Sequence, residues 1–297
     1  MKDYLLLCLL FLAGCSSAQK NGPQAENQLL NDVKVLSSDL YEGRKTGTRG
    51  ALLAREYISG RFKEIGLKAF DSTYAQTFSF RGENELMTGT NLIGYVQGQT
   101  DDVIVISAHY DHLGMINKEI YNGADDNASG IAALLQFAKY FSGIKPVKTL
   151  VFAAFDAEEM GLRGAKAFVA NPPVAISKIL LNINMDMISH NDNNELYVCG
   201  TFKHPELKQF INPGNVPVKV IPGHDDPGQG HDDWTNQSDQ GAFNEKAIPF
   251  LYFGVEDHKD YHKPTDDYEN INKVFLVRAA DAIQHVISNV DKGFKAR

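Results

Sequence analysis

The sequence predicts an α/β fold, a three-layer α/β/α sandwich around a mostly parallel (mixed) central sheet. Two observations lead to this prediction. Short apolar runs of strand length recur along the 297-residue chain, and segments with apolar residues at helical spacing separate them. Runs such as 149–155 are also apolar throughout, as expected for strands of a buried parallel sheet.

The expected elements follow in chain order. A helix over 27–36 begins the domain, and a second helix runs over 49–65, with Gly66 placed as its C-terminal stop. A third helix is expected over 129–141 and a last one over 272–290. Six apolar runs predict strands, at 91–96, 103–108, 149–155, 179–185, 195–198 and 248–253.

Composition and charge narrow the classes of function. A hydrophobic content of 43% is enough for a packed core, and 297 residues are within reach of one large α/β domain or two smaller ones. The formal net charge is -8 and no block of Lys and Arg occurs. A nucleic-acid-binding surface is therefore not expected.

The first residues are typical of an export signal. Lys2 precedes the apolar run Tyr4 to Leu12, which is too short to span a bilayer, and Leu12-Ala13-Gly14-Cys15 resembles the bacterial lipobox. An ordinary secretory signal with a chance cysteine is the alternative. A lipid on Cys15 would anchor the protein to a membrane of the bacterial cell envelope, facing the periplasm or the outer surface. This interpretation divides the chain into a signal peptide (1–14), a flexible tether (15–25) and one folded domain (26–297).

The cysteines agree with this division. Cys8 lies in the signal and Cys15 would carry the lipid, so Cys199 is the one cysteine left in the mature chain. An internal disulfide is then excluded. Cys199 lies in an apolar strand-like run, and buried packing is the expected role rather than nucleophilic chemistry.

Potential metal ligands follow five of the predicted strands or lie in adjoining loops. Ligands of open α/β sheets bind at the carboxyl ends of the strands, so these side chains are expected to converge. Each has a simpler explanation by itself: a turn and N-cap for Asp125-Asp126, or the start of a solvated helix for Glu158-Glu159. The converging candidates are His109, Asp125 or Asp126, Glu158 or Glu159, Asp186 and His262.

Charge balance selects the partner of this cluster. Crowded carboxylates beside a core are costly unless positive charge holds them. Two divalent cations bring four positive charges, which three carboxylates and one hydroxide would balance. Nitrogen and carboxylate donors without a thiolate suit zinc, with cobalt or manganese as substitutes. One of the two glutamates at 158 and 159 would hold metal while its neighbour moves protons.

In this order, the residues resemble the co-catalytic zinc aminopeptidases related to bacterial leucyl aminopeptidase. That metallopeptidase family also includes glutamate carboxypeptidase II, the transferrin receptor ectodomain and glutaminyl cyclase. The part before Asn91 matches only in general character. The resemblance runs through Ala108-His109-Tyr110-Asp111-His112, Asn122 to Gly130, Ala157-Glu158-Glu159 to Gly164, Met185-Asp186-Met187 and Tyr261-His262 to Asp267.

The resemblance implies a zinc-peptidase/phosphorylase-like fold and a role for each matched residue. His109, Asp126 and Asp186 would hold one zinc, and Asp126, Glu159 and His262 the other, with a cis peptide bond after Asp126. Asp111 would orient His109. Glu158 would take a proton from a metal-bridging water and pass it to the leaving amine.

The implied activity is that of a di-zinc aminopeptidase, an exopeptidase that hydrolyses N-terminal residues from peptides. The alternative is one-zinc glutaminyl cyclisation, which the Asp266-Asp267 pair after His262 supports. A receptor-like domain without catalysis is a third hypothesis, which the complete ligand set disfavours. The sequence predicts neither the preferred side chain of the substrate nor an oligomeric state.

The implied metal site assigns no role to two stretches near the expected substrate pocket. The family often has Ser-Asp-His there, whereas this chain has Ser238-Asp239-Gln240. That difference bears on pocket shape and leaves the metal ligands unaffected. The His- and Asp-rich segment from Gly223 to Trp234 is either a solvated loop, a pocket-lining loop or a further metal site, the first being favoured.

Overall fold

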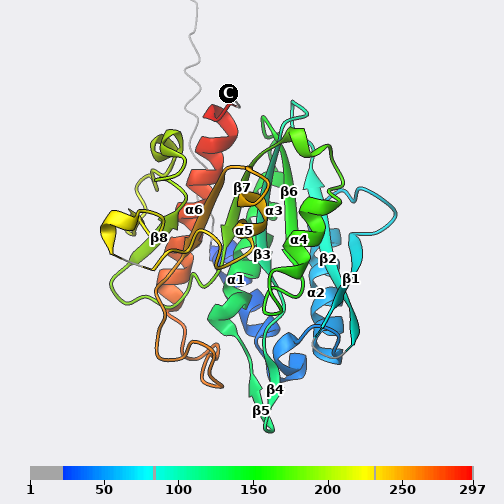
Figure 1. The fold of residues 1–297 in the computed structure, drawn as a ribbon. Coiled ribbons are helices and arrows are strands. Elements are labelled where there is room, and N and C mark those ends of the chain that lie inside the picture. The colour runs from blue at the N-terminus through cyan, green and yellow to red at the C-terminus, as the bar shows by residue number, and fades with distance from the viewer. Residues whose placement is uncertain (1–22, 83–84, 231, 296–297) are drawn as a thin grey trace, which may run out of the picture.

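A three-layer α/β/α sandwich is the architecture of the computed structural model, which describes residues 23–82, 85–230 and 232–295 (Figure 1). The middle layer is an eight-stranded sheet in the order β1-β2-β6-β3-β7-β10-β8-β9. The central strands β6, β3, β7 and β10 are mutually parallel, while β1, β2 and β8 introduce antiparallel pairs. The predicted fold class is therefore confirmed.

The strands of the sheet are β1 (Ala75–Arg81), β2 (Leu86–Val96), β3 (Val103–His109), β6 (Thr149–Phe155), β7 (Ile179–Met185), β8 (Glu195–Cys199), β9 (Lys219–Pro222) and β10 (Phe250–Gly254). A separate hairpin of β4 (Gly114–Ile116) and β5 (Glu119–Tyr121) projects from one end of the molecule (Figure 1). Every residue of β3, β6 and β7 is buried. Helices cover both faces of these strands, which is why apolar residues predominate in their sequences.

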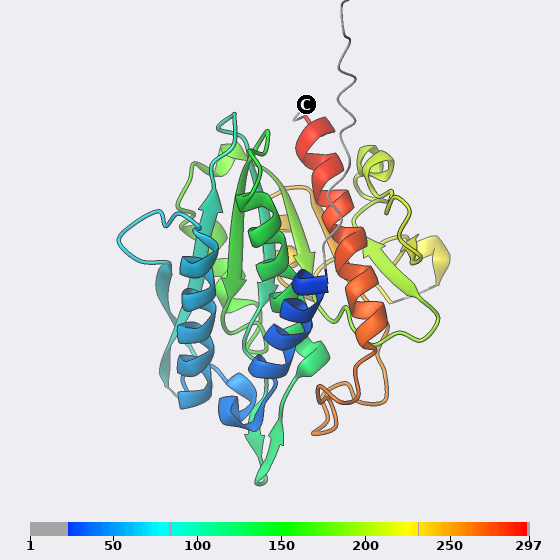
Figure 2. The same cartoon turned by 180° about the vertical axis from the view of Figure 1, so that it is seen from behind.

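Four helices cover one face of the sheet, and two shorter ones lie on the other (Figures 1 and 2). The first group is α1 (Pro23–Leu36), α2 (Arg49–Ile65), α3 (Gly130–Ser142) and α6 (Lys273–Gly293). The second group is α4 (Arg163–Ala170) and α5 (Gln240–Asn244). Single helical turns complete the fold at η1 (Asp39–Arg44), η2 (Ala124–Ser129), η3 (Ile176–Lys178), η4 (Pro205–Phe210) and η5 (Pro227–Gln229).

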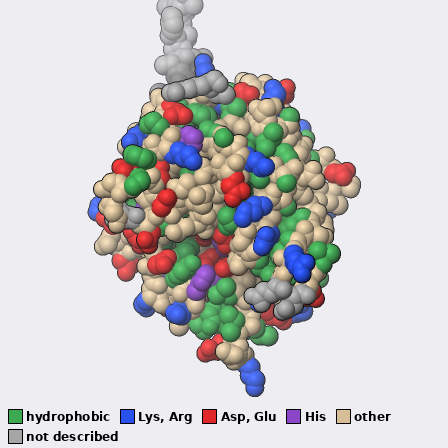
Figure 3. Space-filling model, in the orientation of Figure 1, with side chains coloured by type: hydrophobic (Ala, Val, Ile, Leu, Met, Phe, Trp, Pro, Cys, Tyr) green, Lys and Arg blue, Asp and Glu red, His purple; other side chains and the backbone are tan. Residues whose placement is uncertain are grey.

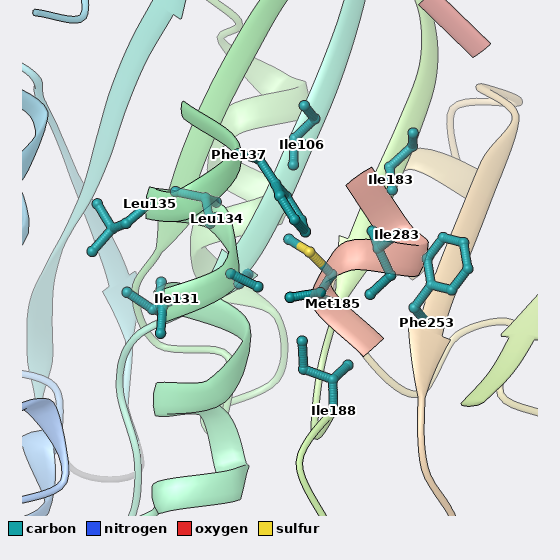
Figure 4. Close-up of a cluster of buried hydrophobic side chains, with 14 of the residues drawn as sticks. Ile106, Ile131, Leu134, Leu135, Phe137, Ile183, Met185, Ile188, Phe253 and Ile283 are labelled. Atoms are coloured by element: carbon teal, nitrogen blue, oxygen red, sulfur yellow. The ribbon is translucent and has the colours of Figure 1, made fainter. Parts of the chain in front are cut away.

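Each face of the sheet has its own apolar core. Between the sheet and the larger helix group, side chains such as Phe137 of α3, Met185 of β7 and Ile283 of α6 are buried together (Figure 4). On the other face the rings of Phe155, Phe168 and Phe243 contact one another with centroids 5.5–6.3 Å apart. These two layers fix the strands whose carboxyl ends carry the predicted ligands.

The predicted helix over 49–65 is confirmed, and Gly66 ends it in the left-handed conformation (φ 84°) that favours glycine. The strands at 149–155 and 179–185 are also confirmed. One boundary is wrong. The first helix begins at Pro23, so residues 23–25 are helical rather than part of the tether. Proline suits the first turn of a helix because the amide there has no partner within the helix.

Several elements were not predicted. Strand β1 alternates between exposed and half-buried residues, and Thr77, Ser79 and Arg81 occupy exposed positions, so it lacks an apolar run. The short strands β4, β5 and β9 and the short helices α4 and α5 offer too few residues for a periodic pattern. The expected signal peptide, Cys15 and positions 16–22 of the tether lie outside the described residues. Within the described part of the chain, no helix combines the length and apolar character needed to cross a bilayer.

Arg44 ties the N-terminal segment to the ends of the sheet. The side chain is almost completely buried, and its guanidinium donates to the backbone carbonyls of Leu36, Tyr110, Asn122 and Gly123 at 2.6–2.8 Å. Burial lowers the pKa of Arg44 to about 10, with Asp126 the first of several carboxylates opposing the shift. The group therefore stays charged at neutral pH, and it fixes the loops that leave β3 and β5.

We expect Arg44→Lys to lower the free energy of unfolding by about 2–4 kcal/mol, because an ammonium cannot reproduce the planar set of donors and leaves buried carbonyls unpaired. Urea unfolding would measure this change. Arg49→Lys is the matched control, since Arg49 pairs with Glu42 at the surface. That control should change the stability by less than about 0.5 kcal/mol. Equal effects of the two substitutions would contradict the proposed anchoring role.

Candidate metal centre

The five predicted ligands converge at the carboxyl ends of the parallel strands. His109 is the last residue of β3, Asp186 follows β7 directly, and Glu159 lies four residues after β6. Asp126 lies in η2, ahead of α3, and His262 lies in the loop after β10. On the face of the molecule shown in Figure 3, acidic side chains and histidine gather in a hollow.

A first group of donors surrounds the imidazole of His109. Its Nε2 lies 3.4 Å from Oδ1 of Asp126 and 3.2 Å from Oδ1 of Asp186. These three side chains are buried, and each offers one atom to a shared point. This is the ligand set that the sequence predicts for one zinc.

A second group uses the other oxygen of Asp126. Nε2 of His262 lies 3.1 Å from Oδ2 of Asp126 and 3.5 Å from Oε2 of Glu159. Asp126 thus turns one oxygen to each group, as a bridging carboxylate would. The cis peptide bond expected after Asp126 is also present.

The spacing of the donors fits zinc. Two ligands that each lie about 2.0–2.1 Å from a tetrahedral zinc are about 3.4 Å apart. The nitrogen–oxygen separations in the two groups are 3.1–3.5 Å. Imidazole and carboxylate donors, with no thiolate, also match the chemistry of catalytic zinc sites.

His112 is a site residue that sequence reasoning missed. Its buried Nδ1 lies 2.8 Å from Oε1 of Glu159 and 3.6 Å from Oδ2 of Asp126. The shorter distance is that of a hydrogen bond, so the imidazole holds one oxygen of Glu159 while the other oxygen faces His262. The sequence contained a signal, since His112 stands three residues after His109, but spacing alone assigns it no role.

Asp111 contacts the imidazole that it is predicted to orient, and it does so mainly through its backbone carbonyl. Nδ1 of His109 lies 3.1 Å from the backbone carbonyl of Asp111, whereas the nearer carboxylate oxygen is 3.7 Å away. The carboxylate instead accepts from the backbone amides of Glu158 at 3.0 Å and Glu159 at 3.3 Å. Asp111 therefore positions the imidazole through its main chain and the two glutamates through its side chain.

The two neighbouring glutamates are electrostatically distinct. Removal from water raises the pKa of Glu158 well above its usual range, and nearby Asp186 contributes in the same direction against His109. Burial alone would also raise the pKa of Glu159, but hydrogen bonds from His112 and His262 hold it well below its usual range. Glu159 is thus suited to remain an anionic ligand, and Glu158 to accept a proton.

Asp125 faces away from this cluster. Its Oδ1 accepts from the backbone amide and hydroxyl of Ser189, each at 2.7 Å, and its Oδ2 lies 3.0 Å from Nε2 of His258. The choice of Asp126 rather than Asp125 as the bridging candidate agrees with this geometry. His258 also stacks on His190, with an interplanar angle of 4°. Together with Asp260, these two histidines form a third group of potential metal donors. Because their rings are parallel, however, the nitrogen lone pairs of the two histidines cannot both point at one ion.

In the stretch Ser238-Asp239-Gln240, Gln240 makes structural hydrogen bonds and Asp239 is a buried carboxylate. Gln240 is a buried link, donating to the carbonyl of Trp234 at 2.7 Å and accepting from Asn184 at 3.1 Å. Asp239 is fully buried, and neither of its oxygens has a hydrogen-bond partner among the described residues. Burial raises the pKa of Asp239 to about 7, opposed by His109.

Asp239 gives a prediction for stability against pH. Its folded pKa of about 7 lies above the value near 3.9 of an unfolded chain, so the folded protein binds this proton more tightly. The stabilisation is complete below about pH 4 and is lost as the pH rises through 7, a change of the order of 4 kcal/mol. Asp239→Asn, which cannot titrate, should therefore gain stability relative to the parent between pH 4 and pH 8.

Urea unfolding of chelator-treated protein at several pH values would measure this difference. The exposed Asp232 provides the control. Asp232→Asn should stay within about 0.5 kcal/mol of the parent at every pH. Parallel pH curves for Asp239→Asn and the parent would show that Asp239 is ionised throughout the range.

The loop from Gly223 to Trp234 contributes packing at both ends. The ring of His224 stacks on Trp234, with centroids 3.4 Å apart, and Nε2 of His224 lies 3.2 Å from Oε1 of Glu256. Trp234 belongs to a buried cluster with Cys199, which confirms the expected packing role of that cysteine. His231 lies outside the described residues.

Comparison with known proteins gives consistent matches. Residues 91–287 match the model of "Peptidase family M28". The chain is 28% identical over 289 residues to leupeptin-inactivating enzyme 1 of Streptomyces exfoliatus, covering 89% of this chain and 61% of that protein. It is 29% identical over 210 residues to aminopeptidase YwaD of Bacillus subtilis, covering 66% and 43% of the two proteins. The chain thus spans less than two thirds of the length of these relatives.

Solved structures share the fold at low sequence identity. A zinc aminopeptidase from Bacillus subtilis superposes with a TM-score of 0.72 at 16% identity, covering 93% of this chain and 98% of that one. A glutaminyl cyclase from Porphyromonas gingivalis also gives a TM-score of 0.72 at 16% identity, covering 88% and 97%. At these identities the likeness concerns the fold alone.

Proposed function

This chain belongs to peptidase family M28, and from that premise we propose that it is a di-zinc aminopeptidase acting on the free N-terminus of peptides. One observation carries the proposal: Asp126 offers its two oxygens to separate donor groups, one around His109 and one around Glu159. A single cation would leave one of these groups without a partner. The number of zinc ions and the individual residue roles are part of the proposal.

The two ions would be held by the predicted ligands. Bound zinc would supply positive charge that polarises the scissile carbonyl and makes water a better nucleophile at neutral pH. The carboxylate of Glu158 takes a proton from the attacking water and delivers it to the leaving nitrogen as the peptide bond breaks. Asp111 holds the backbone of Glu158 in place for both transfers.

The test is hydrolysis of aminoacyl-p-nitroanilides and dipeptides by purified protein with zinc restored. We expect release of the first residue, loss of release after chelation, and its return on adding zinc. N-acetylated versions of the same substrates are the control and should resist cleavage, because an aminopeptidase requires the free amine. Absence of release from the whole panel would overturn the proposal.

Glutaminyl cyclisation is the second candidate. Its sequence support was Asp266-Asp267, but Asp266 accepts from the backbone amides of Asp125 and Asp126 at 2.9 and 3.1 Å. Asp266 therefore has a structural function in positioning the bridging carboxylate. Pyroglutamate formation from an N-terminal glutamine peptide, with no hydrolysis, would favour the cyclase.

For location, we propose that a lipid on Cys15 anchors the domain in the bacterial cell envelope. The support is the lipobox-like stretch ending in Cys15. Cys15→Ser should move the protein from the membrane fraction to the aqueous fraction. A variant that stays with the membranes would contradict this anchor.

A further inference from the structure

A cavity of about 470 Å³ opens on the candidate metal centre. Its inner side consists of site residues, among them Asp126, Glu158 and His262. A substrate residue whose backbone lies at the metal centre would extend its side chain into this space. The rest of the wall includes Leu162, Lys166, Met187, Asn236, Gln237 and Tyr261.

The charge of that outer wall comes from one residue. Among the described residues that line the cavity, Lys166 is the one Lys or Arg. It is half-buried on α4, and its Nζ donates to the backbone carbonyl of Gly161 at 3.2 Å. Gly161 lines the same cavity, so this hydrogen bond holds the ammonium at the wall. Among the described residues, no carboxylate lies within ion-pair distance of Lys166.

A second donor stands on the same wall. Oδ1 of Asn236 accepts from Nδ2 of Asn244 at 2.8 Å. The amide NH₂ of Asn236 is then the part of this side chain that is left to donate. An ammonium and an amide NH₂ both require an acceptor, which a carboxylate provides better than an apolar or cationic group.

The charge of the metal centre does not cancel the preference of this wall for a carboxylate. With two zinc ions bound, their four positive charges would be balanced by Asp126, Glu159, Asp186 and one hydroxide. Glu158, which also lines the cavity, would be neutral in this state because it holds the proton taken from the water. Lys166 then contributes an uncompensated positive charge on the opposite wall. An aspartate or glutamate side chain at the N-terminus of the peptide would meet it across the cavity.

We propose that the cavity selects an acidic N-terminal residue and that Lys166 is the specificity-determining residue. This inference rests on the proposed aminopeptidase function, and it adds the class of substrate. The preference arises from a charge-assisted hydrogen bond between the ammonium of Lys166 and a substrate carboxylate, whose strength corresponds to roughly a tenfold change in kcat/KM.

The test compares Glu-, Gln-, Leu- and Lys-p-nitroanilide as substrates. Gln has nearly the shape of Glu without its charge. The parent should turn over Glu with a kcat/KM about tenfold above that of Gln, mainly through a lower KM. Lys166→Met should remove this advantage while changing kcat/KM for Gln and Leu by less than about threefold. Lys166→Arg should retain the advantage, and Lys166→Glu should shift the preference to the Lys substrate.

Lys178→Met is the matched control, since Lys178 is exposed and does not line the cavity. It should leave the ratio of Glu to Gln unchanged. The inference is overturned if the parent cleaves Leu better than Glu, or if Lys166→Met lowers all four substrates alike. If either of those results is obtained and the Leu substrate is still cleaved, the aminopeptidase proposal stands. If the protein cleaves none of these four substrates and none of the wider panel, both proposals are overturned.

Discussion

Replacing Glu158 with glutamine is expected to lower kcat by about 10²–10⁴-fold while the zinc content stays that of the parent. Glutamine keeps the shape of the side chain but cannot take up and return a proton, and that is the range attributed to a general acid–base group. The raised pKa of Glu158 and the lowered pKa of Glu159 assign the two functions to different residues. Elemental analysis alongside steady-state kinetics would measure both quantities.

Glu159→Gln is the matched comparison for this prediction. It changes the same chemical group one position along the chain, but the side chain of Glu159 faces His112 and His262. We therefore expect loss of bound zinc together with activity. If Glu158→Gln loses zinc and Glu159→Gln retains it, the two roles have been exchanged.

The parts of the fold that could be predicted are those in which one physical effect dominates. Strands β6 and β7 are buried on both faces, so their boundaries follow from the length of the apolar run. Strand β1 lies at the edge of the sheet, where exposed positions tolerate polar side chains and no such run exists. Helix α5 has five residues, fewer than two helical turns.

In the candidate site, too, some features could be predicted from the sequence and others could not. Residues that follow parallel strands were predicted to meet, because topology places the ends of those strands at one edge. Arg44 precedes the resemblance, and within the described residues its guanidinium donates hydrogen bonds only to backbone carbonyls, so no motif identifies it. The side-chain contact of His112 with Glu159 joins residues 47 positions apart, and only the folded structure reveals it. The same holds for the contacts of Asp111, whose carbonyl lies at the imidazole of His109 and whose carboxylate accepts from the backbone amides of Glu158 and Glu159.

Asp126→Asn is expected to remove at least one zinc ion and to lower activity by at least about a thousandfold. An asparagine side chain has one oxygen and one NH₂ group, so it cannot present an oxygen to both donor groups. Bound metal stabilises the folded state by mass action, and the variant should also lose that stabilisation. Elemental analysis, hydrolysis assays and thermal unfolding with and without chelator would test these three expectations.

Asp125→Asn provides the adjacent control, because it alters the next carboxylate of the same loop. Asp125 is engaged by Ser189 and His258 and faces neither donor group. Its substitution should lower thermal stability through the loss of those hydrogen bonds, while zinc content stays near that of the parent and chelation still lowers the melting temperature. In Asp126→Asn the effect of the chelator should instead be reduced, since less metal is bound. The reverse pattern, with zinc lost from Asp125→Asn and kept by Asp126→Asn, would place the bridging carboxylate one residue earlier and undo the two-site geometry on which the proposed hydrolysis depends.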